Sequence, residues 1–241
     1  VMSGNIASFT NAQAVSSIPA RSISSIYSDA REVTRRLAPL DPVYLFSAVN
    51  LARQASRFQC GFPGEVSYAV KANPEECVLD ELTGWDIRHF DVASIGEVEA
   101  LATRHPEATL HYNNPVKAME AIEASYHQYG VRSFALDEPA EFDKISKATG
   151  GDKDVLYSVR FKLGHQGASY DFGSKFGTSP TEAAALLRRI AAAGARPALT
   201  FHPGSQCTDP QMYARYIEAA AEIVAAAGVE VEQINVGGGF P

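Results

Sequence analysis

The feature that most constrains the fold of this chain is a regular alternation of short β-rich runs with longer helical segments. Such an alternation is typical of repeated βα units that assemble into a parallel sheet. Seven runs have the composition expected of strands, namely Val66–Val70, His89–Ala93, Thr109–Tyr112, Ser133–Leu136, Val155–Phe161, Ala198–Phe201 and Gln233–Val236. The sequence therefore predicts an α/β protein with seven visible strands of a (β/α)8 barrel.

Two of the intervening helices carry recognisable start and stop signals. One is predicted to begin at Ser179–Glu182, where a serine, a proline and a glutamate provide a capping box with proline at the first helical position. Gly194 is expected to end it. The next helix is predicted to begin at Asp209 and to end at Gly228, since glycine favours the backbone conformation that closes a helix.

Polar residues or glycine stand at or near the carboxyl ends of the seven runs. In a (β/α)8 barrel these ends converge on one mouth, where that fold carries its chemistry. We therefore expect the candidate site there. The gap between the fifth and sixth runs contains a Gly/Ser-rich insertion, Gly164–Gly177, predicted to form a long loop on the same rim. The residues at the strand ends are Lys71, Asp91, Asn113, Asp137, Arg160, His202 and Gly237.

Composition excludes several classes of protein. The 241 residues include 21 Lys+Arg and 28 Asp+Glu, a net charge of −7, which argues against a nucleic-acid-binding surface. No run approaches the ~18 apolar residues of a membrane-spanning helix. The three cysteines, Cys60, Cys77 and Cys207, lack the paired spacing of a metal site or a disulfide framework. We expect a cytoplasmic protein with neither a metal site nor a membrane or nucleic-acid partner.

The segment Tyr68–Pro74, with the sequence YAVKANP, contains the first candidate site residue, Lys71. A lysine at a strand end is by itself most often a surface charge. The segment, however, resembles the cofactor-lysine motif of the fold-type III pyridoxal phosphate enzymes, the group of alanine racemases and of ornithine and diaminopimelate decarboxylases. The resemblance implies a barrel that binds pyridoxal 5'-phosphate, with Lys71 forming the Schiff base. A buried, partly apolar site would lower the pKa of this amine and make it nucleophilic.

The segment Thr200–Pro210, TFHPGSQCTDP, is similar to the histidine loop of the decarboxylases and closest to the ornithine decarboxylase branch. The resemblance implies that His202 stacks on the pyridine ring and that Ser205 binds the cofactor phosphate. A hydrogen-bonded structural histidine is the alternative. Pro203 stands where the family commonly has an aliphatic residue, and it removes one backbone N–H. We expect Cys207 to pack as a small apolar residue.

The segment Asn235–Pro241, NVGGGFP, resembles the glycine-rich phosphate loop of the same family. Residues without a Cβ let several backbone N–H groups approach one phosphate together. The resemblance therefore implies that the phosphate is bound by Gly237, Gly238 and Gly239.

Three further positions are similar to family motifs. In FDVAS, Asp91 resembles an aspartate close to the cofactor lysine, with a helix cap as its alternative role. Glu97 follows in the same motif. Its alternative role is that of a solvated carboxylate in the first turn of a helix, a position that the helix dipole favours. Arg160 aligns with an arginine near the cofactor face. Its alternative role is to form a salt bridge with a carboxylate on the rim. Lys175 resembles a loop lysine at the subunit interface, or else is a solvated charge.

The resemblance covers Asp41–Pro241 and implies PLP-dependent decarboxylation of ornithine or lysine to a diamine, in polyamine metabolism, by a homodimeric enzyme. Residues 1–40 are expected to form a flexible segment with a first helix, and 41–241 a barrel that is incomplete at its C-terminus. The resemblance implies that family members continue into a last barrel strand and a C-terminal β domain, which we expect to lie outside this sequence. The strand candidate Asp41–Phe46 normally belongs with that β domain.

Four alternative functions stay open. One is decarboxylation of diaminopimelate or a related amino acid. Two are non-catalytic, a PLP-binding protein or a partner that resembles an antizyme inhibitor. An amino-acid racemase is disfavoured because its lysine motif typically continues with Tyr-Gly rather than with Pro74-Glu75.

Overall fold

The computed structural model describes residues 5–6, 12–13, 15–16, 26–163 and 176–240. Lys175 and most of the predicted 164–177 insertion lie outside these residues. The chain divides into two compact units, Val1–Tyr68 with Ala72–Arg88, and Ala69–Lys71 with His89–Pro241. The boundary between residues 40 and 41 stays a prediction.

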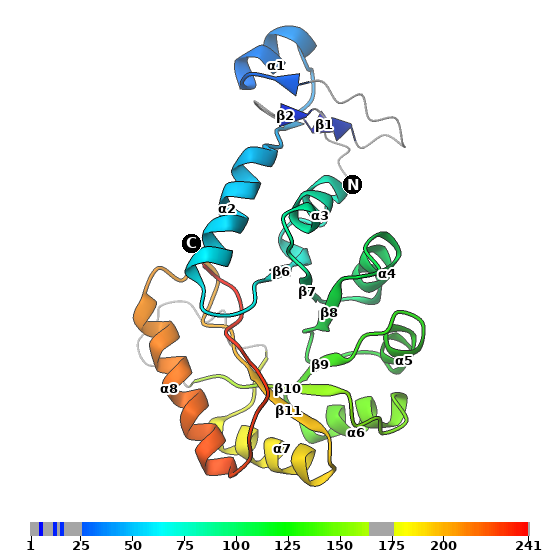
Figure 1. The fold of residues 1–241 in the computed structure, drawn as a ribbon, viewed down its shortest axis with the longest axis vertical. Coiled ribbons are helices and arrows are strands. Elements are labelled where there is room, and N and C mark those ends of the chain that lie inside the picture. Colours follow the sequence, from blue (N-terminus) through cyan, green and yellow to red (C-terminus); the bar gives the residue numbers. More distant parts are fainter. Residues whose placement is uncertain (1–4, 7–11, 14, 17–25, 164–175, 241) are drawn as a thin grey trace. The chain divides into compact units, whose positions relative to one another are not determined.

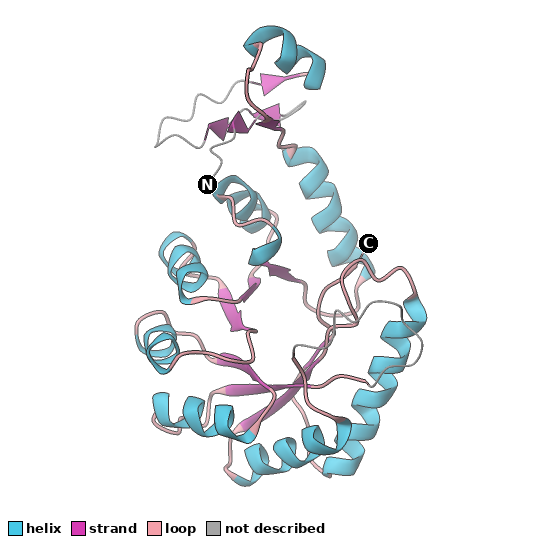
Figure 2. Cartoon of the chain, turned by 180° about the vertical axis from the view of Figure 1, so that it is seen from behind, coloured by secondary structure: helices cyan, strands magenta, loops and turns pink. Residues whose placement is uncertain are grey.

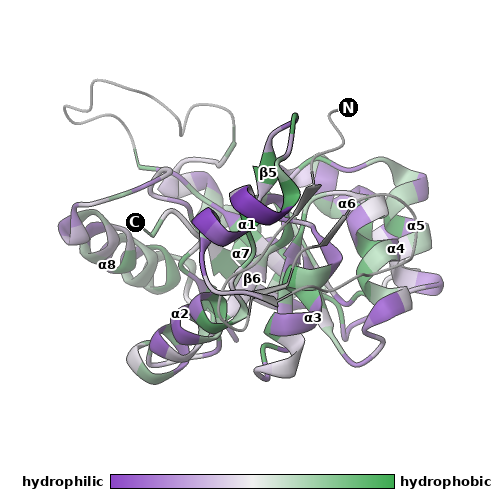
Figure 3. Cartoon of the chain, turned by 90° about the horizontal axis from the view of Figure 1, so that it is seen from above, coloured by the Kyte–Doolittle hydropathy of each residue, from purple (hydrophilic) through white to green (hydrophobic). Residues whose placement is uncertain are grey.

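The first unit contains short strands and three helices. β1 (Asn5–Ile6) pairs with β3 (Val15–Ser16) and β5 (Val43–Tyr44), and β2 (Ala12–Gln13) pairs with β4 (Ile26–Tyr27). The helices are α1 (Ala30–Leu37), α2 (Ala48–Gly61) and α3 (Glu76–Gly84). A small core joins Tyr27, Val33 and Val43. α1 consists mostly of hydrophilic residues (Figure 3).

The second unit is the predicted parallel α/β structure. Its strands succeed one another in chain order and curl into an incomplete (β/α)8 barrel of seven strands (Figure 1). Every predicted run forms a strand whose ends lie within two residues of those expected. The strands of this sheet are β6 (Ser67–Ala69), of which only Ala69 belongs to the second unit, β7 (His89–Val92), β8 (Thr109–Tyr112), β9 (Ser133–Leu136), β10 (Leu156–Arg160), β11 (Arg196–Thr200) and β12 (Ile234–Asn235).

Helices cover the outer face of this sheet (Figure 2). They are α4 (Ile95–Arg104), α5 (Met119–His127), α6 (Pro139–Ala148), α7 (Pro180–Ala192) and α8 (Pro210–Ala227). In the part of the chain that the structure describes, no helix has the length and apolar composition needed to cross a membrane.

The core of the second unit lies between strands and helices. Because side chains alternate across a strand, every second residue points at the helices. Each fully buried apolar side chain contributes roughly 1.5–3 kcal/mol relative to an exposed one, so this layer holds helices and sheet together. From the strands, Phe90, Val92, Phe134, Leu136, Tyr157, Val159 and Leu199 are buried. From the helices, Val98, Leu101, Ile122, Ile145, Leu187, Ile190 and Ile223 are buried.

The predicted helix signals are confirmed. At the start of α7, Ser179 accepts a hydrogen bond from the Glu182 backbone N–H, and the Glu182 carboxylate accepts one from the Ser179 N–H. These bonds satisfy N–H groups that have no partner inside the helix. α8 begins after Asp209 and ends at Gly228, whose φ is +64°.

A buried ion pair links the connection between β8 and α5 to helix α6. The Lys117 Nζ lies 2.9 Å from the Glu141 carboxylate, and the two side chains are 0% and 2% exposed. The Lys117 ammonium also donates to the carbonyls of Asn114 and Ala135, while the Lys144 Nζ lies 2.5 Å from Glu141. Burial lowers the pKa of Lys117 to about 8, although the Glu141 charge opposes that shift.

Candidate active site

Lys71 lies in a 3₁₀ turn, Val70–Ala72, that directly follows β6. Val70 is buried at 2% exposure, which anchors the turn, whereas the Lys71 side chain is exposed. The exposed position of Lys71 differs from the prediction, in which its amine lies in a buried, partly apolar site. The reason is that β6 is an outermost strand of the described sheet, so neighbouring strands cover the turn from one side only.

Asp91 is the third residue of β7 and lies beside His111 of β8 in the parallel register. It is half-buried. The alternative role of Asp91 as a helix cap is wrong, because Ser94 caps α4 and accepts a hydrogen bond from the Glu97 backbone N–H. The Glu97 carboxylate accepts in turn from the Ala93 N–H at 2.7 Å. Glu97 therefore acts as the capping carboxylate, and Asp91 stays within the strand.

Arg160 ends β10 and is half-buried, with its guanidinium 5.6 Å from the centre of the Phe176 ring. Burial lowers the pKa of Arg160, and the negative charge of Asp137 opposes that shift. The Asp137 carboxylate follows β9 and accepts a hydrogen bond from the Gly177 N–H at 2.8 Å. Asp137 is thus the rim carboxylate that faces Arg160, a role that its position at a strand end alone does not reveal.

His202 follows β11 and is half-buried. Burial lowers the pKa of this histidine, and the positive charges of Arg160 and Lys71 lower it further. Each of these effects favours the neutral form of the imidazole. Its Nδ1 accepts a hydrogen bond from the Gly204 N–H at 3.1 Å, which assigns the ring proton to Nε2. Arg160 lies beside Thr200 in the parallel register of β10 and β11, so Arg160 and His202 lie at the same end of the sheet, close enough to Lys71 for its charge to act on the imidazole.

The glycine motif packs directly against the histidine loop. Gly237 and Gly239 have φ angles of +68° and +91°, which a residue with a Cβ rarely adopts. A Cβ on Gly237 would lie 2.1 Å from the Phe201 carbonyl oxygen, and one on Gly239 would lie 1.8 Å from the Gly204 oxygen. Only glycine fits at either position. The motif therefore packs its backbone directly against the backbone of the histidine loop, beside the imidazole.

One backbone hydrogen bond joins the two loops, and a side-chain hydrogen bond lies within the glycine motif. The Cys207 N–H donates to the Gly239 carbonyl at 2.6 Å, and the Asn235 side chain accepts from the Gly237 N–H at 2.8 Å. The Sγ of Cys207 lies 3.5 Å from the Asp209 carbonyl, and Cys207 is half-buried. Ser205 is exposed on the histidine loop. Gly238 has room for a Cβ, which would lie 3.8 Å from the His202 Nε2.

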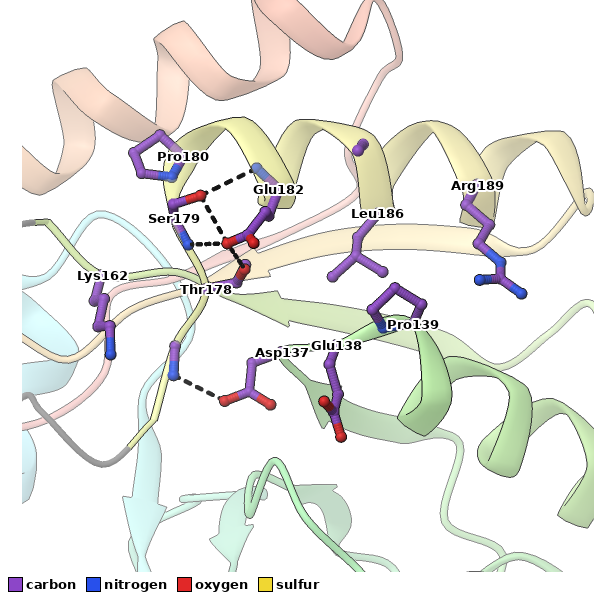
Figure 4. A pocket seen from close by; sticks show the side chains of 12 residues that line it. Asp137, Glu138, Pro139, Lys162, Thr178, Ser179, Pro180, Glu182, Leu186 and Arg189 are labelled. Atoms are coloured by element: carbon purple, nitrogen blue, oxygen red, sulfur yellow. Dashed lines mark hydrogen bonds between the residues drawn. The ribbon is translucent and has the colours of Figure 1, made fainter.

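A cavity of 820 Å³ lies farther along the same rim (Figure 4). None of Lys71, Asp91, His202 or the glycine motif lines it, and its link to the candidate site is Asp137, which faces Arg160. The Glu182 carboxylate in this cavity is engaged by Ser179 and Thr178 and serves to cap α7. Within the described ranges, no group of three or more His, Cys, Asp and Glu side chains could hold a metal ion.

The chain is similar to known proteins over most of its length. Residues 48–241 match the profile described as pyridoxal-dependent decarboxylase, pyridoxal binding domain. The lysine/ornithine decarboxylase of Selenomonas ruminantium is 38% identical over 181 residues, which are 73% of this chain and 45% of that enzyme.

Solved structures give the same picture. A lysine decarboxylase from Selenomonas ruminantium has a TM-score of 0.74 at 30% identity, covering 88% of this chain and 56% of that one. A lysine/ornithine decarboxylase from Vibrio vulnificus, solved with putrescine, has a TM-score of 0.67 at 28% identity, covering 80% and 51%. The chain spans about half the length of these relatives. It belongs to the family of pyridoxal-dependent decarboxylases, matching their pyridoxal binding domain.

Proposed function

We propose that the protein carrying this chain binds pyridoxal 5'-phosphate and decarboxylates ornithine or lysine to the corresponding diamine. The observation that carries this proposal is the glycine motif, whose backbone lies beside a neutral imidazole at the sheet end that also holds Lys71. We also propose that the protein is a homodimer located in the cytoplasm.

The residues of this chain fit the cofactor. A phosphate dianion is bound well by backbone N–H groups of a turn. The Gly237 N–H already donates to the Asn235 side chain, so we assign the phosphate to the N–H groups of Gly238 and Gly239, with Gly237 allowing the close packing of the motif on the histidine loop. The exposed Ser205 hydroxyl adds a donor on the adjoining loop. Half-buried His202 offers a flat, uncharged ring face, which suits stacking on a pyridine ring.

The remaining polar groups suit the reaction. When bound, the cofactor supplies a conjugated ring that accepts the electron pair left by the departing carboxylate. Lys71 provides the amine that attaches the cofactor and carries protons at the reacting carbon. We assign Asp91 to orienting the lysine from the neighbouring strand. Arg160, held opposite Asp137, keeps a positive charge at the rim and favours the neutral form of His202.

The substrate class follows from the relatives. The Selenomonas and Vibrio enzymes are named for lysine and ornithine, and the Vibrio structure contains putrescine. We extend the same substrate class to this chain. Diaminopimelate decarboxylation and a non-catalytic PLP-binding role are the alternatives that an experiment has to separate.

The test begins with an absorbance titration of the purified protein with pyridoxal 5'-phosphate. We expect a Schiff-base band that is lost in Lys71→Ala and kept in Lys162→Ala, a control lysine that follows β10 on the same rim. Ornithine, lysine and diaminopimelate are then assayed separately for carbon dioxide and amine release. A band without any amine product would favour the non-catalytic alternative, and no band in the wild-type protein would refute the proposal.

A further inference from the structure

Tyr213 connects helix α8 to the glycine motif. It lies in the first turn of α8, which Asp209 caps by accepting from the Gln211 N–H at 3.0 Å. The Tyr213 hydroxyl donates to the Gly238 carbonyl oxygen at 3.0 Å. Its ring stacks on Phe240, with the ring centres 4.9 Å apart and the planes 9° from parallel. One side chain on a capped helix thus contacts the motif at two points.

The hydrogen bond to Gly238 determines the orientation of a peptide group. A trans peptide is planar, so the C=O of Gly238 and the N–H of Gly239 point in opposite directions. Because the carbonyl points to Tyr213, the N–H of Gly239 points away from α8. Two other peptides of the motif have partners of their own. The Gly237 N–H donates to the Asn235 side chain, and the Gly239 carbonyl accepts from the Cys207 N–H. Two peptides lie between these fixed points, and Tyr213 holds one of them, Gly238–Gly239.

Two properties of Tyr213 separate this role from ordinary packing. The ring contact with Phe240 would survive in a phenylalanine, whereas the bond to Gly238 needs the hydroxyl. Burial raises the pKa of Tyr213 to about 12, so the hydroxyl stays protonated and remains a donor throughout the neutral range.

We propose that Tyr213 is a positioning residue for the phosphate loop, which rests on the proposed binding of pyridoxal 5'-phosphate. Its hydroxyl orients the Gly238–Gly239 peptide so that the Gly239 N–H is presented to a phosphate monoester dianion. The role concerns the phosphate of the ligand and not its ring, because Tyr213 contacts only the loop.

The test compares two ligands that differ only in the phosphate. Dissociation constants of pyridoxal 5'-phosphate and of pyridoxal are measured by fluorescence titration for the wild-type protein and for Tyr213→Phe. We expect Tyr213→Phe to bind pyridoxal 5'-phosphate between about threefold and tenfold more weakly, the net value of one hydrogen bond, and pyridoxal equally well. Tyr213→Leu, which also loses the ring contact, is expected to bind pyridoxal 5'-phosphate more weakly still.

Tyr126→Phe is the matched control, because its hydroxyl donates to Asp152 outside the candidate site. We expect wild-type affinity for both ligands. Unchanged affinity of Tyr213→Phe for pyridoxal 5'-phosphate would overturn the proposal for Tyr213 alone, as would an equal loss for both ligands. A wild-type protein that does not bind pyridoxal 5'-phosphate would overturn the proposed function and this positioning role together.

Discussion

Gly237→Ala tests how closely the glycine motif approaches the histidine loop. The chain offers a matched control in Gly228, because the two glycines have nearly the same φ, +68° and +64°. At Gly228, which ends α8, an added Cβ would meet nothing within 4 Å. At Gly237 it would lie 2.1 Å from the Phe201 carbonyl oxygen. The two substitutions therefore share the backbone strain and differ in the collision.

The magnitudes follow from that difference. A left-handed alanine costs about 1–2 kcal/mol, partly offset because alanine restricts the unfolded chain, so Gly228→Ala is expected to cost about 1 kcal/mol. In Gly237→Ala the Cβ has to move beyond 3.0 Å from the Phe201 oxygen. This shift would disrupt the pairing of β11 with β12, where the Phe201 N–H donates to the Asn235 carbonyl. Adding that loss gives about 3–4 kcal/mol in total.

The assay is urea unfolding followed by circular dichroism, with the free energy of unfolding extrapolated linearly to water. Titration with pyridoxal 5'-phosphate is run in parallel. We expect Gly237→Ala to lose both stability and cofactor affinity, and Gly228→Ala to lose only the smaller amount of stability. Equal losses of unfolding free energy in the two variants would show that the close approach to Phe201 does not exist.

Three further predictions concern buried or neighbouring charges. Glu141→Gln should lower the free energy of unfolding by about 3–5 kcal/mol, because the Lys117 ammonium stays buried with carbonyl partners only. Lys117→Met should lower the free energy of unfolding by less, since the Glu141 carboxylate keeps its ion pair with Lys144. Urea unfolding that shows equal costs would contradict this asymmetry. Because the folded pKa of Lys117 is about 8 and the unfolded value is 10.5, the unfolded chain holds more protons between those pH values. The stability of the wild-type protein relative to Lys117→Met should therefore rise by roughly 2 kcal/mol from about pH 7.5 to about pH 9.5, and a constant difference would disprove the shift. Arg160→Met should raise the pKa of His202, as followed by NMR titration of its Cε1 proton, since a positive charge that disfavours the imidazolium is removed. An unchanged pKa would mean that the two side chains do not interact.

Much of the fold could be predicted because its elements depend on local sequence. Strand runs such as Val155–Phe161 are recognisable from β-branched and aromatic residues between turn signals. The start of α7 depends on Ser179, Pro180 and Glu182, which lie within one helical turn. Such signals act over three or four residues, so the linear order of side chains is enough to place them.

The roles of several polar residues could not be predicted in the same way. Whether Asp91 or Ser94 caps α4 depends on which residue ends the strand, and the structure assigns the cap to Ser94 and Glu97. The buried contact of Lys117 with Glu141 joins residues 24 positions apart. Tyr213, whose hydroxyl contacts Gly238, carries no motif of its own. These contacts arise only when separate elements are packed.

The sequence by itself determined the parallel βα architecture, the order of the motifs and the identity of Lys71, His202 and the three glycines as candidate site residues. Local composition and short motifs are enough for this, because they depend on neighbours along the chain. Tertiary structure decided that Lys71 is exposed, that the His202 proton resides on Nε2, and that Gly237 contacts the Phe201 carbonyl. The physical reason is that exposure, pKa and close backbone approach depend on distances between segments that only the parallel register of the strands brings together.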